Sequence, residues 1–211
     1  MNRLTEHFLS APGGIFTITD VHNAFDGSDF SRHALIKRAL ADGEILGIRR
    51  GLYCLAPRYN RSPVNPYALS QRIYGPSYVS LESALSFHGW IPEAVYTCTC
   101  VSFNRSKRFE TPLGQFSFER VLQKALFCQV ERVAEPGSVV YFMATPAKAL
   151  ADMVYTRKAP WGTIDDAAGD LRIEHDDTRG VTIDELDVLM DNYDNRRVRR
   201  FLATWKGALK P

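Results

Sequence analysis

Residues 28–55 decide the fold of the first part of this chain, and they are SDFSRHALIKRALADGEILGIRRGLYCL. The first half predicts a helix over residues 30–41, because apolar residues recur there at i, i+1, i+4 and i+5 and form one stripe. The second half predicts a β-hairpin, since the β-prone runs 44–49 and 52–55 flank a turn that contains Gly51. The apolar stripe of the helix consists of Leu35, Ile36, Ala39 and Leu40.

Two shorter helices are predicted before this stretch. Leu4, Phe8 and Leu9 form a first short apolar stripe, and Thr19 can cap a second helix that starts at Asp20. Three short helices followed by a two-stranded ribbon with a basic tip are typical of a winged helix-turn-helix, which binds DNA through its third helix and its hairpin.

The outer face of the 30–41 helix and the hairpin tip hold residue types that bind DNA. First-turn amides and Ser31 suit phosphate oxygens, and Arg32 suits a forked contact to guanine. Basic side chains elsewhere on the helix and at the hairpin tip suit phosphates or the minor groove. The alternative for the helix alone is an ordinary solvated face. The candidate DNA-binding residues are Ser31, Arg32, His33, Lys37, Arg38, Arg49 and Arg50.

A boundary between two domains is predicted after the hairpin. Pro57, Pro63 and Pro66 fall within ten residues, which no helix or central strand tolerates. We therefore expect a winged helix-turn-helix domain over residues 1–60 and a second domain over residues 61–211. Strands and helices alternate irregularly in the second domain, which predicts an α+β fold with a small, mostly antiparallel sheet.

Composition and length exclude several classes of protein. The chain has 211 residues, of which 45% are hydrophobic and 24% charged, so global disorder is excluded. No apolar stretch approaches the roughly 18 residues of a membrane span, and the N-terminal sequence lacks the layout of a signal peptide. We expect a cytoplasmic protein without a membrane partner, whose four cysteines are reduced thiols.

Charge is segregated along the chain although the net charge is only +2. Residues 152–191 hold eleven acidic and four basic residues, whereas residues 196–210 hold six basic residues and no acidic one. The dense run from Arg196 to Arg200 has three interpretations: a second nucleic-acid surface, a clamp for an acidic partner, or a face packed against the acidic block of the same chain.

Metal binding and catalysis find little support in the sequence. Cys98 and Cys100 lack a second pair of ligands at zinc spacing, and Glu174–Asp177 lacks a calcium-loop pattern. Ser80 and His88 are better explained as residues at the two ends of one helix than as a nucleophile and its base. The motifs of hydrolases, phosphate-binding loops and zinc proteases are missing. We expect no metal, no cofactor and no enzymatic activity.

The whole chain resembles the AbiEi antitoxins, the DNA-binding half of abortive-infection toxin–antitoxin systems. The most specific segments are YVSLESALSFHG at residues 78–89 and ATPAKALAD at residues 144–152. TPLG at residues 111–114 is a further match, and residues 34–43 and 48–53 are similar to the recognition helix and wing of that family.

This resemblance implies an autorepressor that binds inverted repeats of double-stranded DNA in its own promoter. It also implies a C-terminal domain that counters a nucleotidyltransferase-like toxin. Residues 1–62 have a net charge of only +2, which favours several copies bound cooperatively along a repeat. Two alternatives remain: a stand-alone regulator whose second domain senses a ligand, and an enzyme of an unusual nuclease or transferase type.

Overall fold

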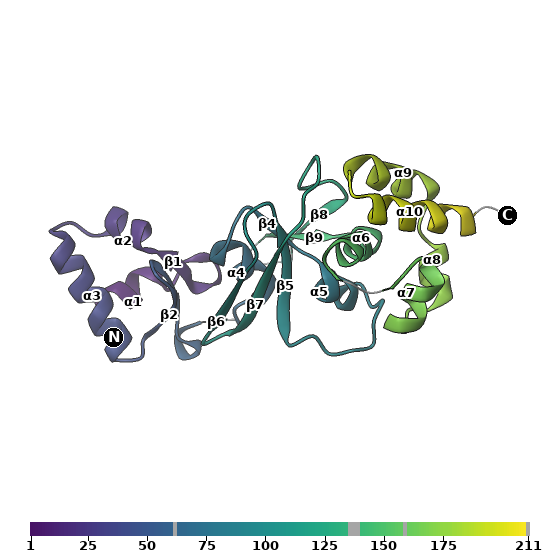
Figure 1. The fold of residues 1–211 in the computed structure, drawn as a ribbon. Coiled ribbons are helices and arrows are strands. Elements are labelled where there is room, and N and C mark those ends of the chain that lie inside the picture. Colours follow the sequence, from purple (N-terminus) through teal and green to yellow (C-terminus); the bar gives the residue numbers. More distant parts are fainter. Residues whose placement is uncertain (61–62, 135–139, 158–159, 210–211) are drawn as a thin grey trace.

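The computed structural model describes residues 1–60, 63–134, 140–157 and 160–209 of the chain. The described residues form a mixed α+β structure with a three-stranded sheet and a six-stranded sheet. Figure 1 shows an elongated molecule, in which the N-terminal helices lie at one end and the C-terminal helices at the other. No helix of the described residues is long and apolar enough to cross a membrane.

The N-terminal part consists of short helices and an antiparallel sheet with the strand order β1-β3-β2. Its core contains Leu4, Phe8, Phe16, Val21 and Ile36. Phe8 and Phe16 stack with their ring centroids 4.1 Å apart, which joins the first helix to the sheet. The elements are α1 (Arg3–Phe8), a 3-10 turn (Pro12–Gly14), β1 (Ile15–Thr17), α2 (Ile18–Ala24), α3 (Asp29–Ala41), β2 (Ile45–Arg49), β3 (Leu52–Leu55) and a 3-10 turn (Pro57–Tyr59).

Helix α2 begins two residues earlier than predicted. Thr17, not Thr19, is the N-cap, and its hydroxyl accepts a hydrogen bond from the amide of Asp20 at 3.2 Å. The carboxylate of Asp20 accepts in return from the Thr17 amide at 2.7 Å. This reciprocal capping box fixes the helix start, because Asp20 is the third helical residue and not the first.

Helix α3 confirms the predicted helix, whereas its apolar stripe was predicted wrongly at one end. Ile36 and Ala39 are buried and Leu35 is half-buried, but Leu40 is 40% exposed. Leu40 lies beside Gly47 of β2, which has no side chain to cover it. The buried face therefore centres on Ile36 and Ala39.

The second part is built around a six-stranded sheet with the order β6-β7-β5-β4-β9-β8. The sheet is larger than predicted, and two of its five pairings, β4 with β9 and β5 with β7, are parallel. The elements are α4 (Pro66–Ile73), β4 (Ser77–Val79), α5 (Leu81–Phe87), β5 (Thr97–Ser102), β6 (Lys107–Thr111), β7 (Gly114–Arg120), β8 (Val130–Val133), β9 (Tyr141–Ala144), α6 (Pro146–Thr156), α7 (Ile164–Leu171), α8 (His175–Arg179), α9 (Ile183–Asn192) and α10 (Arg196–Ala208).

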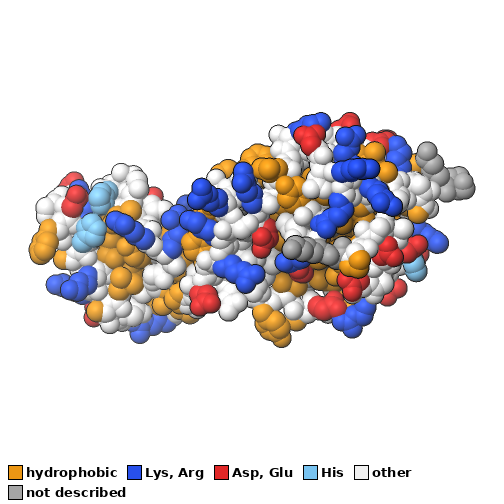
Figure 2. Space-filling model, in the orientation of Figure 1, with side chains coloured by type: hydrophobic (Ala, Val, Ile, Leu, Met, Phe, Trp, Pro, Cys, Tyr) orange, Lys and Arg blue, Asp and Glu red, His pale blue; other side chains and the backbone are white. Residues whose placement is uncertain are grey.

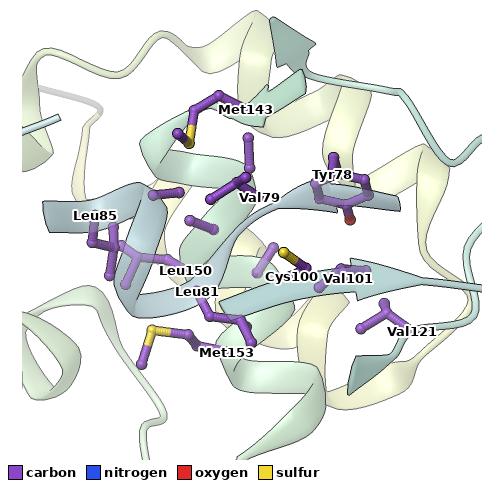
Figure 3. Close-up of a cluster of buried hydrophobic side chains, with 14 of the residues drawn as sticks. Tyr78, Val79, Leu81, Leu85, Cys100, Val101, Val121, Met143, Leu150 and Met153 are labelled. Carbon is purple, nitrogen blue, oxygen red and sulfur yellow. The ribbon is translucent and has the colours of Figure 1, made fainter. Parts of the chain in front are cut away.

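The core of the second part lies between this sheet and its helices. Figure 3 shows Val79 of β4, Cys100 of β5, Met143 of β9 and Leu150 of α6 in one buried cluster. Figure 1 shows α6 beside the sheet, with α9 and α10 beyond it. The first part of the chain lies at the end of the molecule opposite to α9 and α10.

Strand β3 joins the two parts, because its side chains alternate between two cores. Leu52 and Cys54 belong to the core of the second part, whereas Leu55 belongs to the core of the first and Tyr53 packs against it. Ile48 of β2 also lies in the core of the second part. The predicted boundary between residues 60 and 61 adjoins residues 61–62, which lie outside the described residues.

Candidate nucleic-acid interface

One face of α3 is exposed along its whole length. Phe30, His33, Ala34, Lys37 and Ala41 follow one another at i, i+3, i+4, i+7 and i+11, which places them on a single helical stripe. All five are exposed, and Phe30 is 85% exposed. The stripe lies opposite the buried Ile36 and Ala39, and its alanines leave a thin surface between the larger side chains.

The sequence did not single out Phe30. It stands in the first turn, where helix-turn-helix proteins contact base edges. An exposed aromatic ring at such a position suits apolar contact with the methyl group of thymine. The available signal was that Phe30 falls outside the apolar stripe of its own helix.

The first turn of α3 is ordered by its own polar groups. The Ser28 hydroxyl accepts from the Ser31 amide at 3.2 Å, and the Ser31 hydroxyl donates to the Ser28 carbonyl at 2.7 Å. Nδ1 of His33 lies 2.7 Å from the Asp29 carbonyl oxygen. The positions of Ser31 and His33 are thus fixed relative to the helix start, on the surface.

Arg32 connects α3 to α2. Its Nε donates at 2.8 Å to the carbonyl of Phe25, the residue that follows α2, and its Nη1 lies 3.0 Å from the Asp29 carboxylate. The side chain is only 18% exposed. These contacts give Arg32 a positioning role at the junction of the two helices, and base contact by Arg32 stays a prediction.

The hairpin tip lies against the start of α2. The amide of Ile18 donates to the Gly51 carbonyl at 2.9 Å, and Gly51 has a φ of +76°, which glycine adopts readily. Arg49 and Arg50 are both exposed. Arg49 Nη2 lies 3.4 Å from the carbonyl oxygen of Arg72, at the end of α4. The tip is therefore held between the first and second parts of the chain.

Further basic residues lie where the hairpin meets the second part of the chain. We name Arg49, Arg72, Arg105 and Lys107 the junction basic cluster; all four are exposed. Tyr74 holds two of them, because its hydroxyl donates to the Arg105 carbonyl at 3.1 Å and its ring lies 5.2 Å from Lys107 Nζ. Figure 2 shows Lys and Arg side chains along the narrow middle of the molecule.

The remaining candidate on α3 faces a different direction. Arg38 lines a groove of about 280 Å³ together with Arg3, Asp42 and Glu44. Arg58 donates to the carbonyls of Asp42 and Gly43 at 2.8 and 3.1 Å, and so satisfies acceptors at the end of α3. The structure therefore places His33 and Lys37 on one face of α3, Arg38 beside the N-terminus, and Arg49 and Arg50 on the hairpin.

Residues 78–89 and residues 144–152 meet in a buried polar network. Asp152 accepts from the hydroxyls of Tyr78 and Ser80 at 2.8 Å each and from that of Tyr193 at 2.6 Å. Lys148 Nζ lies 3.5 Å from the same carboxylate and donates to Tyr193 at 2.5 Å. The Ser80 hydroxyl thus donates to Asp152. Ser80 lies at the start of α5, as predicted, but its side chain does not cap the helix.

Burial sets the proton affinities in this network. Lys148 and Asp152 are both fully buried. Desolvation lowers the pKa of Lys148, although the Asp152 carboxylate opposes that change. Desolvation also raises the pKa values of Tyr78 and Tyr193 well above the usual range, and the negative charge of Asp152 adds to the increase. The two segments therefore contribute to a folded core and not to the exposed face of α3.

The cysteines and the acidic stretch show no metal geometry. Cys98 and Cys100 are buried with their sulfur atoms 3.9 Å apart, and burial raises the pKa of the Cys100 thiol. Glu174–Asp177 lies at the start of the five-residue helix α8. Within the described residues, no three His, Cys, Asp or Glu side chains are placed to share a metal ion.

The exposed arginines of the basic run on α10 differ in their contacts. Arg197 donates to carbonyls at the end of α6, including those of Val154 and Arg157. Arg196, Arg199 and Arg200 instead line a groove of about 410 Å³. The interpretation in which the run packs against residues 152–191 is supported for Arg197, whose carbonyl acceptors belong to that block. Beyond the run, Lys206 pairs with Asp187 at 2.6 Å. For Arg196, Arg199 and Arg200, a second nucleic-acid surface and an acidic partner stay predictions.

Comparison with known proteins adds no family to this description. A scan against models of protein families matches none, and a search of curated proteins also gives no match.

Proposed function

We propose that this protein is a cytoplasmic, sequence-specific DNA-binding repressor, and that residues 1–60 are its winged helix-turn-helix. The observation that supports this most directly is the exposed stripe of α3, from Phe30 to Ala41, on a helix whose opposite face is buried. The order α1, β1, α2, α3, β2, β3 matches the layout of that fold. Helix α3 would enter the major groove, because a groove of about 12 Å admits one helix.

The charges around α3 suit the duplex backbone. Lys37 on the stripe and Arg50 at the hairpin tip would contact phosphates, while Phe30 and His33 would lie against base edges. The junction basic cluster extends the positive surface from the hairpin onto the second part of the chain. Contacts of this kind with DNA phosphates would supply most of the affinity for DNA, although the net charge of the first domain is modest.

The proposal includes an antitoxin role, which is supported by the resemblance to AbiEi antitoxins. In this role the protein binds inverted repeats upstream of its own operon, associates cooperatively on them, and opposes a nucleotidyltransferase-like toxin through the second domain. It performs no catalytic step of its own and needs no cofactor. The test is co-expression with such a toxin encoded beside this chain: full growth rescue supports the role, and no rescue by a folded, expressed protein contradicts it.

The DNA-binding proposal predicts a specific effect of two hairpin substitutions. Arg49→Ala together with Arg50→Ala should weaken binding to operator and random duplexes alike, because lost phosphate contacts carry no sequence information. The slope of log affinity against log salt should fall by roughly one per lost contact. Fluorescence anisotropy over about 50–200 mM salt measures both quantities.

Arg179→Ala is the control for a lost positive charge elsewhere, since it removes one exposed arginine from α8, at the other end of the molecule. Its affinity and salt slope should equal those of the unmodified protein. If the hairpin variant also retains the full salt slope, the hairpin does not contact phosphates and this part of the proposal is wrong.

A further inference from the structure

The second part of the chain contains a cavity of about 640 Å³ over one face of β5, β7 and β6. This volume lies within the range of small-molecule sites. The strand register brings polar residues side by side on its floor, because cross-strand partners share a face. One row consists of Thr97, Gln115 and Glu110, and the next of Thr99, Ser117 and Arg108.

The carboxylates of the cavity exceed its available cations. Glu82 Oε1 accepts from Arg157 Nη2 at 2.5 Å, while its Oε2 is buried and has no hydrogen-bond partner among the described residues. Glu110 and Glu119 also line the cavity and form no ion pair within the described residues. The cavity therefore offers acceptors that lack donors.

The remaining walls suit a hydrocarbon chain. Ile91, Val95 and Leu171 contribute apolar side chains to the lining. Tyr96, which also lines the cavity, is 91% exposed. The face of an exposed aromatic ring attracts cations. Arg108 is exposed on the edge strand β6. Its positive charge would therefore repel a cationic ligand at one end of the cavity.

We propose that this cavity binds a small organic cation, in which a primary amine or guanidinium group is attached to a short hydrocarbon chain. The cationic end would donate to Glu82, Glu110 and Glu119, and the methylene groups would lie against the apolar wall. Tyr96 would cover the ligand from the solvent side. This site lies within the second part of the chain and does not depend on the DNA-binding proposal.

The test is isothermal titration of the full chain, free of DNA, with spermidine and with agmatine. We expect at least one of them to bind with a Kd of about 1 mM or tighter. Neutral 1,4-butanediol should not bind, because it keeps the chain and lacks the charge. Magnesium chloride at matched ionic strength should not bind comparably, because it lacks the hydrocarbon part.

Two variants locate the binding site. Glu110→Gln with Glu119→Gln keeps the side-chain shapes and should weaken the cation by about tenfold or more, and Tyr96→Ala should weaken it as well. Glu131→Gln on β8, at the opposite edge of the sheet, is the control for a lost negative charge outside the cavity and should leave the affinity unchanged. Absence of binding by both cations, equal binding of magnesium, or equal affinity in the cavity variant and the control would each overturn the proposal.

Discussion

Lys148 and Asp152 are the residues whose environment differs most from what their type suggests. Both are fully buried and lie 3.5 Å apart on α6. Their other partners come from other elements: Tyr78 on β4 donates to Asp152, and Tyr193 after α9 contacts both. Removing one member of a buried ion pair leaves the other charge without compensation, which costs more than the pair itself contributes.

Lys148→Met should therefore lower the free energy of unfolding by about 3–5 kcal/mol. Adding Asp152→Asn should recover part of this loss, because the remaining carboxylate charge is removed while hydrogen-bond acceptance is kept. Urea denaturation of both variants measures the difference. A double variant less stable than Lys148→Met alone would show that the charges are not coupled as described.

Helix-start signals that combine two residues were more reliable than single capping residues such as Thr19. The Thr-Pro pair at residues 145–146 and the T-x-x-E pattern at residues 182–185 are signals of helix starts. In the structure Thr145 caps α6, and Thr182 forms a capping box with Glu185. The burial of Lys148 could not be predicted, because a lysine on an apolar helix is usually solvated and its partner Tyr193 is 45 residues away.

Helix α3 and the β2–β3 hairpin were predicted as elements because their patterns are continuous in sequence. The helix has a serine N-cap and ends near Gly43, and the hairpin closes at Gly51. The parallel pairings β4–β9 and β5–β7 were not predicted, since parallel neighbours are separated by other elements and leave no turn signal.

Helix α3 is buried on one face and exposed on the other, which predicts unequal effects of two similar substitutions on stability. Ile36→Ala removes a buried side chain and should destabilise the protein by about 2–5 kcal/mol. Leu40→Ala removes a side chain that is 40% exposed and should cost clearly less. Thermal and urea unfolding compare the two variants directly, and equal losses would contradict the observed burial of this helix.

At the scale of the whole molecule, the buried network makes global stability depend on alkaline pH. The pKa values of Tyr78 and Tyr193 are raised by burial, so both hydroxyls stay protonated in the folded state after they ionise in the unfolded state. Stability is then retained below the usual tyrosine pKa of about 10 and is lost as the pH rises above it. Lys148 acts in the opposite direction. Because its pKa is lowered in the folded state, its contribution to the free energy of unfolding increases with pH until the usual lysine pKa of 10.5 is reached.

We therefore expect the free energy of unfolding to fall steeply above a pH of about 10.5, where Lys148 no longer offsets the two tyrosines and the raised pKa values of Tyr67 and Cys100 add to the decline. Tyr193→Phe should be less stable at neutral pH, because Asp152 and Lys148 lose a partner, and should show a shallower alkaline decline. Urea denaturation across this pH range provides the measurement. An equally steep decline in Tyr193→Phe would assign the pH dependence to other groups.

The molecular scale is also where the sequence was least informative about the site. The junction basic cluster joins Arg49 to Arg72, Arg105 and Lys107, and these residues come from separate elements. Only packing of the first sheet against the second part of the chain brings Arg49 to Arg72. The stripe on α3, by contrast, follows from helical spacing once the helix is predicted.

DNA binding by the exposed face of α3 is tested by a DNase footprint of the full chain on the DNA upstream of its own gene. We expect protection of an inverted repeat, which is lost in a folded His33→Ala, Lys37→Ala variant and retained in Arg179→Ala. No protection by the unmodified protein, or equal protection by the α3 variant, would show that the exposed face of α3 does not bind this duplex.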